Sequence, residues 1–305
     1  MDCLEQLQLP QLELLHSGKV RDSFRATPQT RLIVVSDRLS AFDFILQTPI
    51  PYKGAVLNGL SNWWFSQTAD ILPNHFVQVL DPNVTLVREA MPIKVEMVVR
   101  GYITGSVWRG YLAGERNFSG VVIPEGLQKN EAFKQPIVTP TTKEKNDRPI
   151  SPAELVAEGW VSADLYQKME AAALQLYARG AAILQQKDIV LVDTKYEFGL
   201  LDGNLLLIDE IHTPDSSRFW YLADYEQNPS QAEQIDKEYI RQWMMGNLVD
   251  GHYPTSLPDE IVQEATQRYL KIYESICGQP LQIDETIPIQ ERIIKNLQKA
   301  GFLTS

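Results

Sequence analysis

The most strand-like stretch of the chain covers residues 189–211 and reads IVLVDTKYEFGLLDGNLLLIDEI. Two apolar runs flank Asp202-Gly203, a dipeptide typical of the two-residue turn of a β-hairpin. In the first run, Asp193, Lys195 and Glu197 alternate with uncharged residues, and side chains two positions apart share one face of a strand. The stretch therefore predicts an antiparallel hairpin with one charged face.

This charged face has two interpretations. Charges between apolar runs must be paired, so the face could be an internal ladder of salt bridges. Carboxylates beside a lysine can also hold Mg²⁺ together with a polyphosphate, which predicts a functional site. We favour the functional interpretation, because a strand rarely carries so many charges without a partner or a ligand.

The elements expected around this hairpin differ between the two halves of the chain. The first half predicts strands over residues 31–36, 75–79, 84–87 and 94–99, and a short helix over residues 58–69. The second half predicts helices over residues 163–186, 258–277 and 288–300, with Ser162 as an N-cap, Gly278 as a helix end and a capping box at residues 230–233. The order contains no βαβ alternation, so we expect an α+β fold with a domain boundary near residues 90–100.

Composition argues against several classes of protein. The 305 residues are enough for about two domains, and 44% hydrophobic with 22% charged residues is typical of a globular chain. A net charge of −11 disfavours a general nucleic-acid binder. No apolar run approaches the ~20 residues of a membrane helix, and the first residues do not resemble a secretory signal. The two cysteines predict no disulfide framework, and the four histidines lack the spacing of a zinc site. Together, these observations lead us to expect a cytoplasmic protein with no membrane or nucleic-acid partner.

Four further segments combine basic residues with glycine, hydroxyl or acidic residues, and they cover residues 18–22, 36–43, 100–109 and 140–149. Each has a plainer alternative: a surface turn, a surface ion pair between Asp37 and Arg38, an ordinary capped helix, and a solvated linker. In the third segment, we expect Ser106 to cap a helix whose free amides, with Arg100, bind an anion. Anion-binding segments together with the carboxylates of the hairpin predict nucleotide-dependent group transfer.

The order of these segments resembles the SAICAR synthetase (phosphoribosylaminoimidazole-succinocarboxamide synthase) family of purine biosynthesis. The resemblance rests on GKVRD at 18–22, residues 36–43, residues 95–106, PTTK at 140–143, VDTKYEFG at 192–199, DE at 209–210 and PDSSR at 214–218. It covers roughly residues 15–250, and the most specific elements are residues 95–106 and 192–199. The length of the chain suggests the longer form of the family, with extra C-terminal helices.

The resemblance implies an ATP-dependent carbon–nitrogen ligase. Such an enzyme joins the carboxylate of carboxyaminoimidazole ribotide to the amine of L-aspartate through an acyl phosphate, with ATP and Mg²⁺. The implied fold is a small antiparallel β domain over a larger α+β domain, with ATP in the cleft and a distant likeness to kinases. The expected domains are residues 1–95, residues 96–255 and a C-terminal helical extension over residues 256–305. We expect only small-molecule partners, and a monomer is favoured with the oligomeric state left open.

The resemblance also assigns roles to individual residues, motif by motif. The expected catalytic residues are Lys195, Glu197 and Asp209. The expected ATP-binding residues are Lys19, Arg21, Glu96, Glu197 and Asp209. The expected substrate-binding residues are Asp37, Arg38, Arg100, Ser106, Lys143, Asp147 and Arg218, and the expected metal ligands are Asp193, Glu197 and Asp209. Lys94 and Asn146 depart from the family pattern, which usually has proline and often histidine there, so no role is carried over to them.

Strand parity sets a condition on this assignment. A simple two-residue turn at Asp202-Gly203 places Glu197 opposite Ile208, so Asp209 falls on the other face of the sheet. A shared nucleotide–metal site needs Glu197 and Asp209 on one side. We therefore predict an odd-length loop or a β-bulge in the hairpin, or alternatively a twisted strand end that lets Asp209 reach around.

Two other functions stay open at this point. A kinase-like phosphotransferase would stop at phosphorylation and consume ATP without aspartate. A non-catalytic nucleotide-binding regulator would bind ATP without turnover, and it would not need the crowded carboxylates of Asp193, Glu197 and Asp209.

Overall fold

The computed structural model describes residues 2–42, 44–144, 147–232, 235 and 237–304. The chain has the expected α+β fold and divides into two compact units. The first contains Met1–Phe65, His75–Glu89 and Ile235–Ser305, and the second contains Ser66–Asn74 and Ala90–Gln234. The chain passes from the first unit to the second after Glu89, next to the boundary expected near residues 90–100. Residues 256–305 do not stand apart as a third domain, because they belong to the first unit.

The first unit is built on a five-stranded antiparallel sheet with the order β1-β2-β3-β7-β6. Its strands are β1 Leu14–Ser17, β2 Arg21–Thr27, β3 Thr30–Val35, β6 Phe76–Asp81 and β7 Val84–Arg88. A small hairpin of β4 Ser40–Ala41 and β5 Phe44–Ile45 follows β3. The strands expected in this part of the sequence are confirmed, because alternating β-branched residues pair across short turns.

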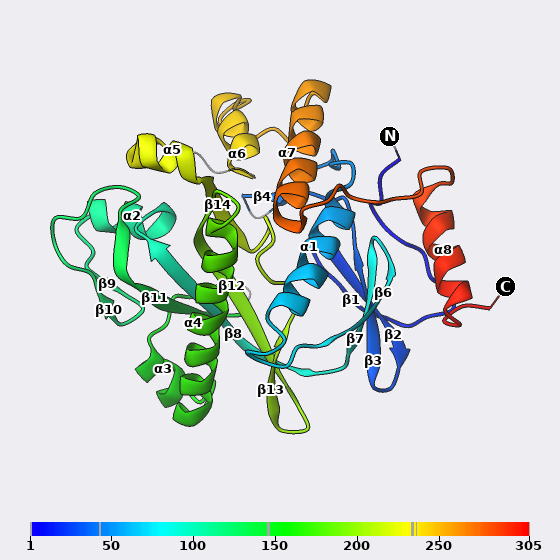
Figure 1. Ribbon diagram of the computed structural model, residues 1–305, viewed down its shortest axis with the longest axis horizontal. Helices are drawn as coiled ribbons and strands as arrows, with labels where there is room; N and C mark the ends of the chain where they lie inside the picture. The colour runs from blue at the N-terminus through cyan, green and yellow to red at the C-terminus, as the bar shows by residue number, and fades with distance from the viewer. Residues whose placement is uncertain (1, 43, 145–146, 233–234, 236, 305) are drawn as a thin grey trace. The chain divides into compact units, whose positions relative to one another are not determined.

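The helices of the first unit come mostly from the end of the chain (Figure 1): α1 Lys53–Gln67, α6 Lys237–Gly246, α7 Asp259–Cys277 and α8 Ile289–Lys299. Helix α7 ends at Gly278, whose φ of 76° is left-handed, as its sequence predicts. Helix α8 covers the sheet, where Ile293 and Leu297 share an apolar core with Leu4 and other buried residues. The C-terminal helices are therefore part of the core of this unit.

The second unit is built on another five-stranded antiparallel sheet, with the order β11-β8-β12-β13 and β14 paired to β12. The strands are β8 Met91–Tyr102, β11 Ala132–Thr142, β12 Ile189–Leu201, β13 Asn204–Ile208 and β14 Ser217–Tyr221, with a separate pair of β9 Asn117–Phe118 and β10 Val121–Val122. The helices are α2 Gly105–Leu112, α3 Pro152–Ala157, α4 Ala163–Gln185 and α5 Leu222–Gln227, with a 3₁₀ turn over Pro229–Gln231. The long helix α4 packs on β12 and β8 (Figure 1).

Two predicted helix caps have different outcomes. Ser162 caps α4 as predicted, because its side chain accepts a hydrogen bond from the amide of Leu165 at 3.2 Å. Ser106 is not an N-cap: α2 begins at Gly105, and Thr104 holds the extended cap conformation. The capping box expected at residues 230–233 meets a 3₁₀ turn at Ser230, and Glu233 lies outside the described residues. Over the described residues, we find no helix with the length and apolarity needed to cross a membrane.

Candidate active site

The charged face predicted for β12 exists, and its neighbours β8 and β11 extend it. Asp193 lies opposite Arg100 on β8, and Glu197 lies opposite Glu96. Directly opposed residues of antiparallel strands project to the same side of the sheet, so these side chains share one face. Strand β11 places Thr141 opposite Glu96 on that face, and Lys143 follows directly after the strand.

The opposite face of β12 explains why the charged face is held firmly. Tyr196 and Phe198 are fully buried on the side against which α4 packs. The hydroxyl of Tyr177 on α4 donates to the carbonyl of Leu191 at 2.7 Å. An apolar face packed on a long helix fixes the strand, and the charged side chains are therefore carried on a rigid element.

Two lysines and two buried glutamates form one cluster on the charged face. The ammonium of Lys195 lies 2.7 Å from Oε1 of Glu96 and 3.0 Å from Oε1 of Glu197. The other oxygen of Glu197 contacts the ammonium of Lys143. Glu96 and Glu197 are buried, whereas the Lys143 side chain is 44% exposed. The cluster thus places two cations at the solvent-facing edge of two buried carboxylates.

The pKa shifts in this cluster follow from burial and from neighbouring charge. Burial lowers the pKa of Lys195, but the carboxylates of Glu197, Glu96 and Asp209 outweigh burial and raise it well above the ordinary value. These carboxylates therefore favour the charged form of Lys195. Burial, and then the charge of Asp209, raise the pKa of Glu197, while the two lysines oppose this shift. The carboxylates of Glu197 and Asp209 therefore gain from any additional cation placed beside them.

The carboxylates of Glu96, Glu197 and Asp209 offer the hard oxygen donors that Mg²⁺ prefers. Within the described residues, no three histidine, cysteine, aspartate or glutamate side chains are gathered closely enough to hold a metal ion. The donor chemistry fits Mg²⁺, but in this arrangement ammonium groups already contact Glu96 and Glu197. Binding of a divalent ion would require these ion pairs to rearrange.

The hairpin itself is regular, so the predicted odd-length loop or bulge within it is wrong. Pairing runs unbroken from Leu201 opposite Asn204 back to Glu197 opposite Ile208. Asp202 and Gly203 form the turn with φ of 51° and 78°, and two positive φ values match the right-handed twist of the flanking strands. The register of β12 and β13 therefore conflicts with a shared site for Glu197 and Asp209, as strand parity predicts.

The alternative prediction, a twisted strand end that lets Asp209 reach around, agrees with the backbone at this residue. Strand β13 ends at Ile208, and Asp209 adopts a left-handed backbone with φ of 65°. A left-handed residue redirects the chain out of the pleat, so strand parity no longer applies to Asp209. Its charge raises the pKa of both Lys195 and Glu197. Strained conformations of this kind gather at functional sites.

The chain after Asp209 is anchored by His212, a residue with no expected role. The Tyr196 hydroxyl lies 2.6 Å from Nε2 of His212, and burial lowers the pKa of this histidine to about 3, so its ring is neutral. His212 packs on Gly180 of α4, where a Cβ atom would lie 2.3 Å from Cε1 of the ring. The spacing of the histidines carried no signal for this role, because the partners of His212 lie on two other elements.

A second charged group lies farther along β12 and contains two arginines. Asp193 accepts from Arg100 Nη1 at 3.4 Å, and Arg218 Nε lies 3.2 Å from its other oxygen. Arg100 also donates to Thr139 Oγ1 at 2.8 Å. Burial lowers the pKa of the Arg100 guanidinium, Asp193 opposes this shift and Arg218 adds to it. Two guanidinium groups around one carboxylate leave a net positive charge at this point of the face.

The arginine pair lies beside the first turn of α2. A Cβ atom on Gly105 would be 2.0 Å from Nη1 of Arg218, so a larger residue would push this guanidinium out of its present position. The first amides of a helix have no partner within the helix and favour an anion. Ser106, the second residue of α2, is exposed there even though it is not the cap. The predicted anion site at Arg100, Ser106 and Arg218 therefore has a physical basis.

Asp193 does not join the other expected metal ligands. It lies four positions before Glu197 on the strand, which places their Cα atoms about 13 Å apart. A single ion with bonds of about 2 Å cannot contact both side chains. The structure instead makes Asp193 the counter-ion of Arg100 and Arg218.

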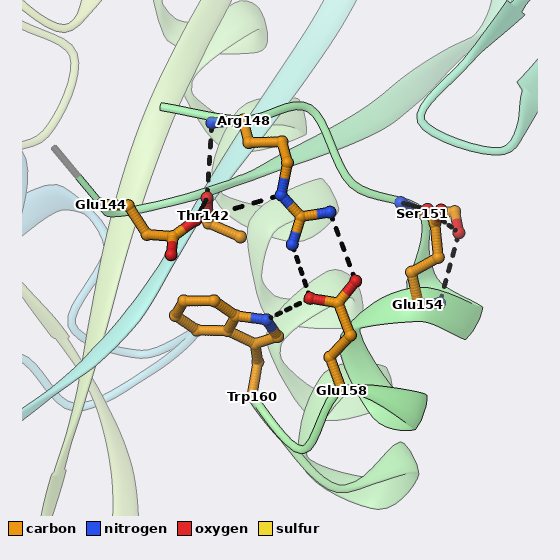
Figure 2. Close-up of polar contacts among 7 residues, drawn as sticks. All are labelled: Thr142, Glu144, Arg148, Ser151, Glu154, Glu158 and Trp160. Atoms are coloured by element: carbon orange, nitrogen blue, oxygen red, sulfur yellow. Dashed lines mark hydrogen bonds and ion pairs between the residues drawn. The ribbon is translucent and has the colours of Figure 1, made fainter. Parts of the chain in front are cut away.

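The described residues on either side of positions 145–146 are fastened to one another and to α3, so this stretch is not a free linker (Figure 2). The Thr142 amide donates to the Arg148 carbonyl at 2.9 Å, and the Arg148 amide donates to Thr142 Oγ1 at 3.3 Å. The Arg148 guanidinium forks onto Glu158, which also accepts from Trp160 at 2.9 Å. Asp147 is exposed in this loop, and Asn146 lies outside the described residues. The loop holds Lys143 at the glutamate cluster.

The four remaining site residues, Lys19, Arg21, Asp37 and Arg38, belong to the first unit. Asp37 is buried, and its carboxylate accepts from the amides of Leu4 at 2.7 Å and Gly54 at 2.8 Å. It therefore anchors the N-terminal segment and the start of α1, which is a structural role. Arg38 pairs with Asp22 at 3.0 Å, so the alternative of an ion pair between Asp37 and Arg38 is not the pair that forms.

Comparisons with known proteins place this geometry in a family. A family model described as SAICAR synthetase matches residues 14–255. The chain is 42% identical to the phosphoribosylaminoimidazole-succinocarboxamide synthase of Legionella pneumophila (strain Paris), over 97% of this chain and 98% of that protein. It is 44% identical to the enzyme of the same name from Azobacteroides pseudotrichonymphae genomovar. CFP2, over 93% of this chain and 90% of that protein.

Solved structures agree with the sequence comparisons. The fold matches the SAICAR synthase from Saccharomyces cerevisiae, solved in complex with SAICAR, with a TM-score of 0.83 and 33% identity. The match covers 91% of this chain and 99% of that one. The antiparallel sheets, the ordered motifs and these matches lead to one conclusion: the chain belongs to the SAICAR synthetase family.

Proposed function

We propose that the chain joins the carboxylate of carboxyaminoimidazole ribotide to the amine of L-aspartate, using ATP and Mg²⁺. One observation carries the proposal: the arginine pair around Asp193 and the lysine–glutamate cluster around Glu197 lie on one face of β12, and the Cα atoms of Asp193 and Glu197 are about 13 Å apart along the strand. A ribotide lying along this strand has its phosphate at the arginines and its carboxylate at the lysines. The substrate would thereby bridge both clusters.

The phosphate end is held by charge and by geometry. The guanidinium groups of Arg100 and Arg218 can each fork onto phosphate oxygens, and the amides at Gly105 and Ser106 add donors. Asp193 orients both guanidinium groups before the phosphate binds, because it already contacts each of them. A dianionic phosphate is well matched to this net positive group.

The carboxylate end is where activation takes place. A free carboxylate does not react with an amine, because its oxygen is a very poor leaving group. Transfer of a phosphoryl group from ATP gives an acyl phosphate, and attack by the neutral aspartate amine then expels phosphate. Lys195, held as a cation by its glutamate neighbours, stabilises the charge that spreads over the transferred phosphoryl group.

Lys143 and the carboxylates complete this end. The exposed Lys143 ammonium can pair with the substrate carboxylate, and the loop base around Arg148 keeps it within reach. Bound Mg²⁺ would be held by Glu197 and Asp209, with Glu96 beside them, and would neutralise charge on the ATP phosphates. Lys19 and Arg21 would contact phosphates of ATP.

The experiment that tests the proposal is ADP release measured with each component omitted in turn. We expect rapid release only when ribotide, L-aspartate, ATP and Mg²⁺ are all present, with the succinocarboxamide product formed in equal amount. Full-rate ADP release without aspartate would support a kinase-like phosphotransferase. ATP binding without any turnover would support a regulator. A cytoplasmic monomer is our expectation for the working enzyme, and light scattering in solution tests its oligomeric state.

A further inference from the structure

We propose that Arg38 is a positioning residue that shapes the loop of residues 18–21 for the phosphates of ATP, and not a ligand of the ribotide. This inference rests on the proposed function of that loop. It changes the role expected for Arg38 from its motif, and the contacts of its guanidinium group carry the change.

The guanidinium of Arg38 is occupied by the loop and its surroundings. Its Nε donates to the carbonyl of Lys19 at 3.0 Å, and Nη2 donates to the carbonyl of Gly18 at 3.1 Å. Both terminal nitrogens contact the carboxylate of Asp22, at 3.0 and 3.3 Å. Nη1 also donates to the carbonyl of Glu5 at 2.5 Å. The side chain is only 13% exposed, so it offers little surface to a substrate.

Ser36 holds the carbonyl of the next loop residue, Val20, in the same way. Its amide and its hydroxyl both donate to the carbonyl of Val20, at 2.9 and 2.8 Å. Asp22 is itself buried and accepts from Ser17 Oγ at 2.7 Å, so the carboxylate that orients Arg38 is fixed. The carbonyls of three successive residues, Gly18, Lys19 and Val20, are thus held by the segment that follows β3.

The consequence for the loop follows from peptide geometry. In a trans peptide, the carbonyl of one residue and the amide of the next point in opposite directions. Carbonyls turned toward Arg38 and Ser36 therefore direct the amides of residues 19, 20 and 21 to the other side. Successive amides that point one way form an anion-binding concavity, which suits a polyphosphate. Arg38 thereby orients the backbone amides of the loop toward the phosphates, although its own guanidinium group does not bind them.

The test compares Arg38→Met and Arg38→Lys with the matched control Arg25→Met. Arg25 lies on β2 of the same sheet and pairs with Glu13 at 2.6 Å, away from the contacts of the loop. The direct readout is the affinity for ADP with Mg²⁺ by calorimetry, and the second is the KM for the ribotide. We expect Arg38→Met to weaken ADP binding about tenfold, because it removes several charged hydrogen bonds that shape the loop. The ribotide KM should stay unchanged.

Arg38→Lys should recover little of the ADP affinity, since one ammonium cannot reach two carbonyls and a carboxylate together. Hydrogen exchange should accelerate in residues 17–23 of Arg38→Met and stay unchanged in the second unit. If Arg38→Met does not fold, Asp22→Asn is a milder substitution that tests the same contacts. We expect Asp22→Asn to weaken ADP binding as well.

Two outcomes would overturn the proposal. A raised ribotide KM with unchanged ADP affinity would make Arg38 a substrate ligand, and no change in either would remove its role. Failure of the proposed function has a different signature: wild-type protein would bind ADP but form no succinocarboxamide product. The ADP comparison between Arg38→Met and Arg25→Met would then still decide the role of Arg38.

Discussion

Individual residues gain their roles here from what surrounds them. Lys195 is a lysine on a buried strand, and three carboxylates keep it charged although burial disfavours its charge. Asp193, four residues before Glu197 on the same strand, pairs with two arginines and so has a different task. Residues that share one face of one strand therefore serve opposite ends of the proposed substrate.

Lys195→Met should lower kcat at least about 100-fold, since it removes a fixed cation aimed at the phosphoryl group. Loss of the ammonium also leaves Glu96 and Glu197 without their common partner. Steady-state kinetics with saturating substrates measure the effect, and Lys168→Met is the control because Lys168 pairs with Asp164 on the exposed surface of α4. An unchanged kcat would show that Lys195 is structural.

Arg100→Lys should raise the KM for the ribotide about tenfold or more, because a point charge cannot replace a planar fork on a phosphate. The KM for ATP should change little. Arg116→Lys, at an exposed pair with Glu125, is the matched control. An equal rise in both KM values, or in neither, would contradict the placement of the ribotide phosphate at Arg100.

At the scale of secondary-structure elements, β12, β13 and α4 determine where the carboxylates of the site lie. Strands β12 and β13 keep a regular register, and the left-handed backbone at Asp209 ends strand parity at this residue. The turn depends on His212, which fits between Tyr196 of β12 and Gly180 of α4. Helix α4 thus supports the site without contributing a reacting group.

Gly180→Ala tests this coupling between helix and site. The added Cβ would lie 2.3 Å from the His212 ring, so the ring and the chain from Asp209 must shift. We expect kcat to fall and the free energy of unfolding to drop by about 1–3 kcal/mol, as for other overpacked cores. Gly246→Ala is the control, because a Cβ there meets nothing within 4 Å. Equal behaviour of the two variants in kinetics and urea unfolding would refute the coupling.

At the scale of the whole molecule, both ends of the chain are tied into the first unit. Residues before 14 and after 255 lie outside the family match, yet both pack in the core of the first unit. Arg292 of α8 forks onto Asp81 at 3.0 Å, and Asp37 holds the amide of Leu4. Of these buried groups, Asp37 makes the stability of this unit sensitive to pH.

The pH dependence of Asp37 has a definite sign. Burial raises its pKa to about 6, although the amides of Leu4 and Gly54 and the charges of Lys53 and Arg292 oppose the shift. The folded state therefore binds more protons than the unfolded state between about pH 4 and pH 6, and the contribution of Asp37 to stability falls as pH rises through this window.

Asp37→Asn removes this titration. We expect wild-type protein to lose stability relative to Asp37→Asn by roughly 1–3 kcal/mol between pH 4.5 and pH 7.5. Urea unfolding of both proteins at the two pH values measures the difference. A constant difference between the proteins would mean that Asp37 titrates at its ordinary pKa in the fold.

Much of the fold and of the site could be predicted before the structure. The hairpin turn at Asp202-Gly203, the cap at Ser162, the helix end at Gly278 and the charged face of β12 are confirmed. Each depends on residues close together in the chain, where periodicity and turn chemistry act directly. The order of the motifs alone was enough to identify the family.

Other features were decided by the tertiary structure alone. The cap at Thr104 in place of Ser106, the partners of Asp193, the direction of Asp209 and the contacts of Arg38 all differ from expectation or were not foreseen. Each depends on atoms that come from segments far apart in the sequence. A local pattern states which face a residue occupies and which charge it carries, but only the packed backbone determines which distant group lies opposite it.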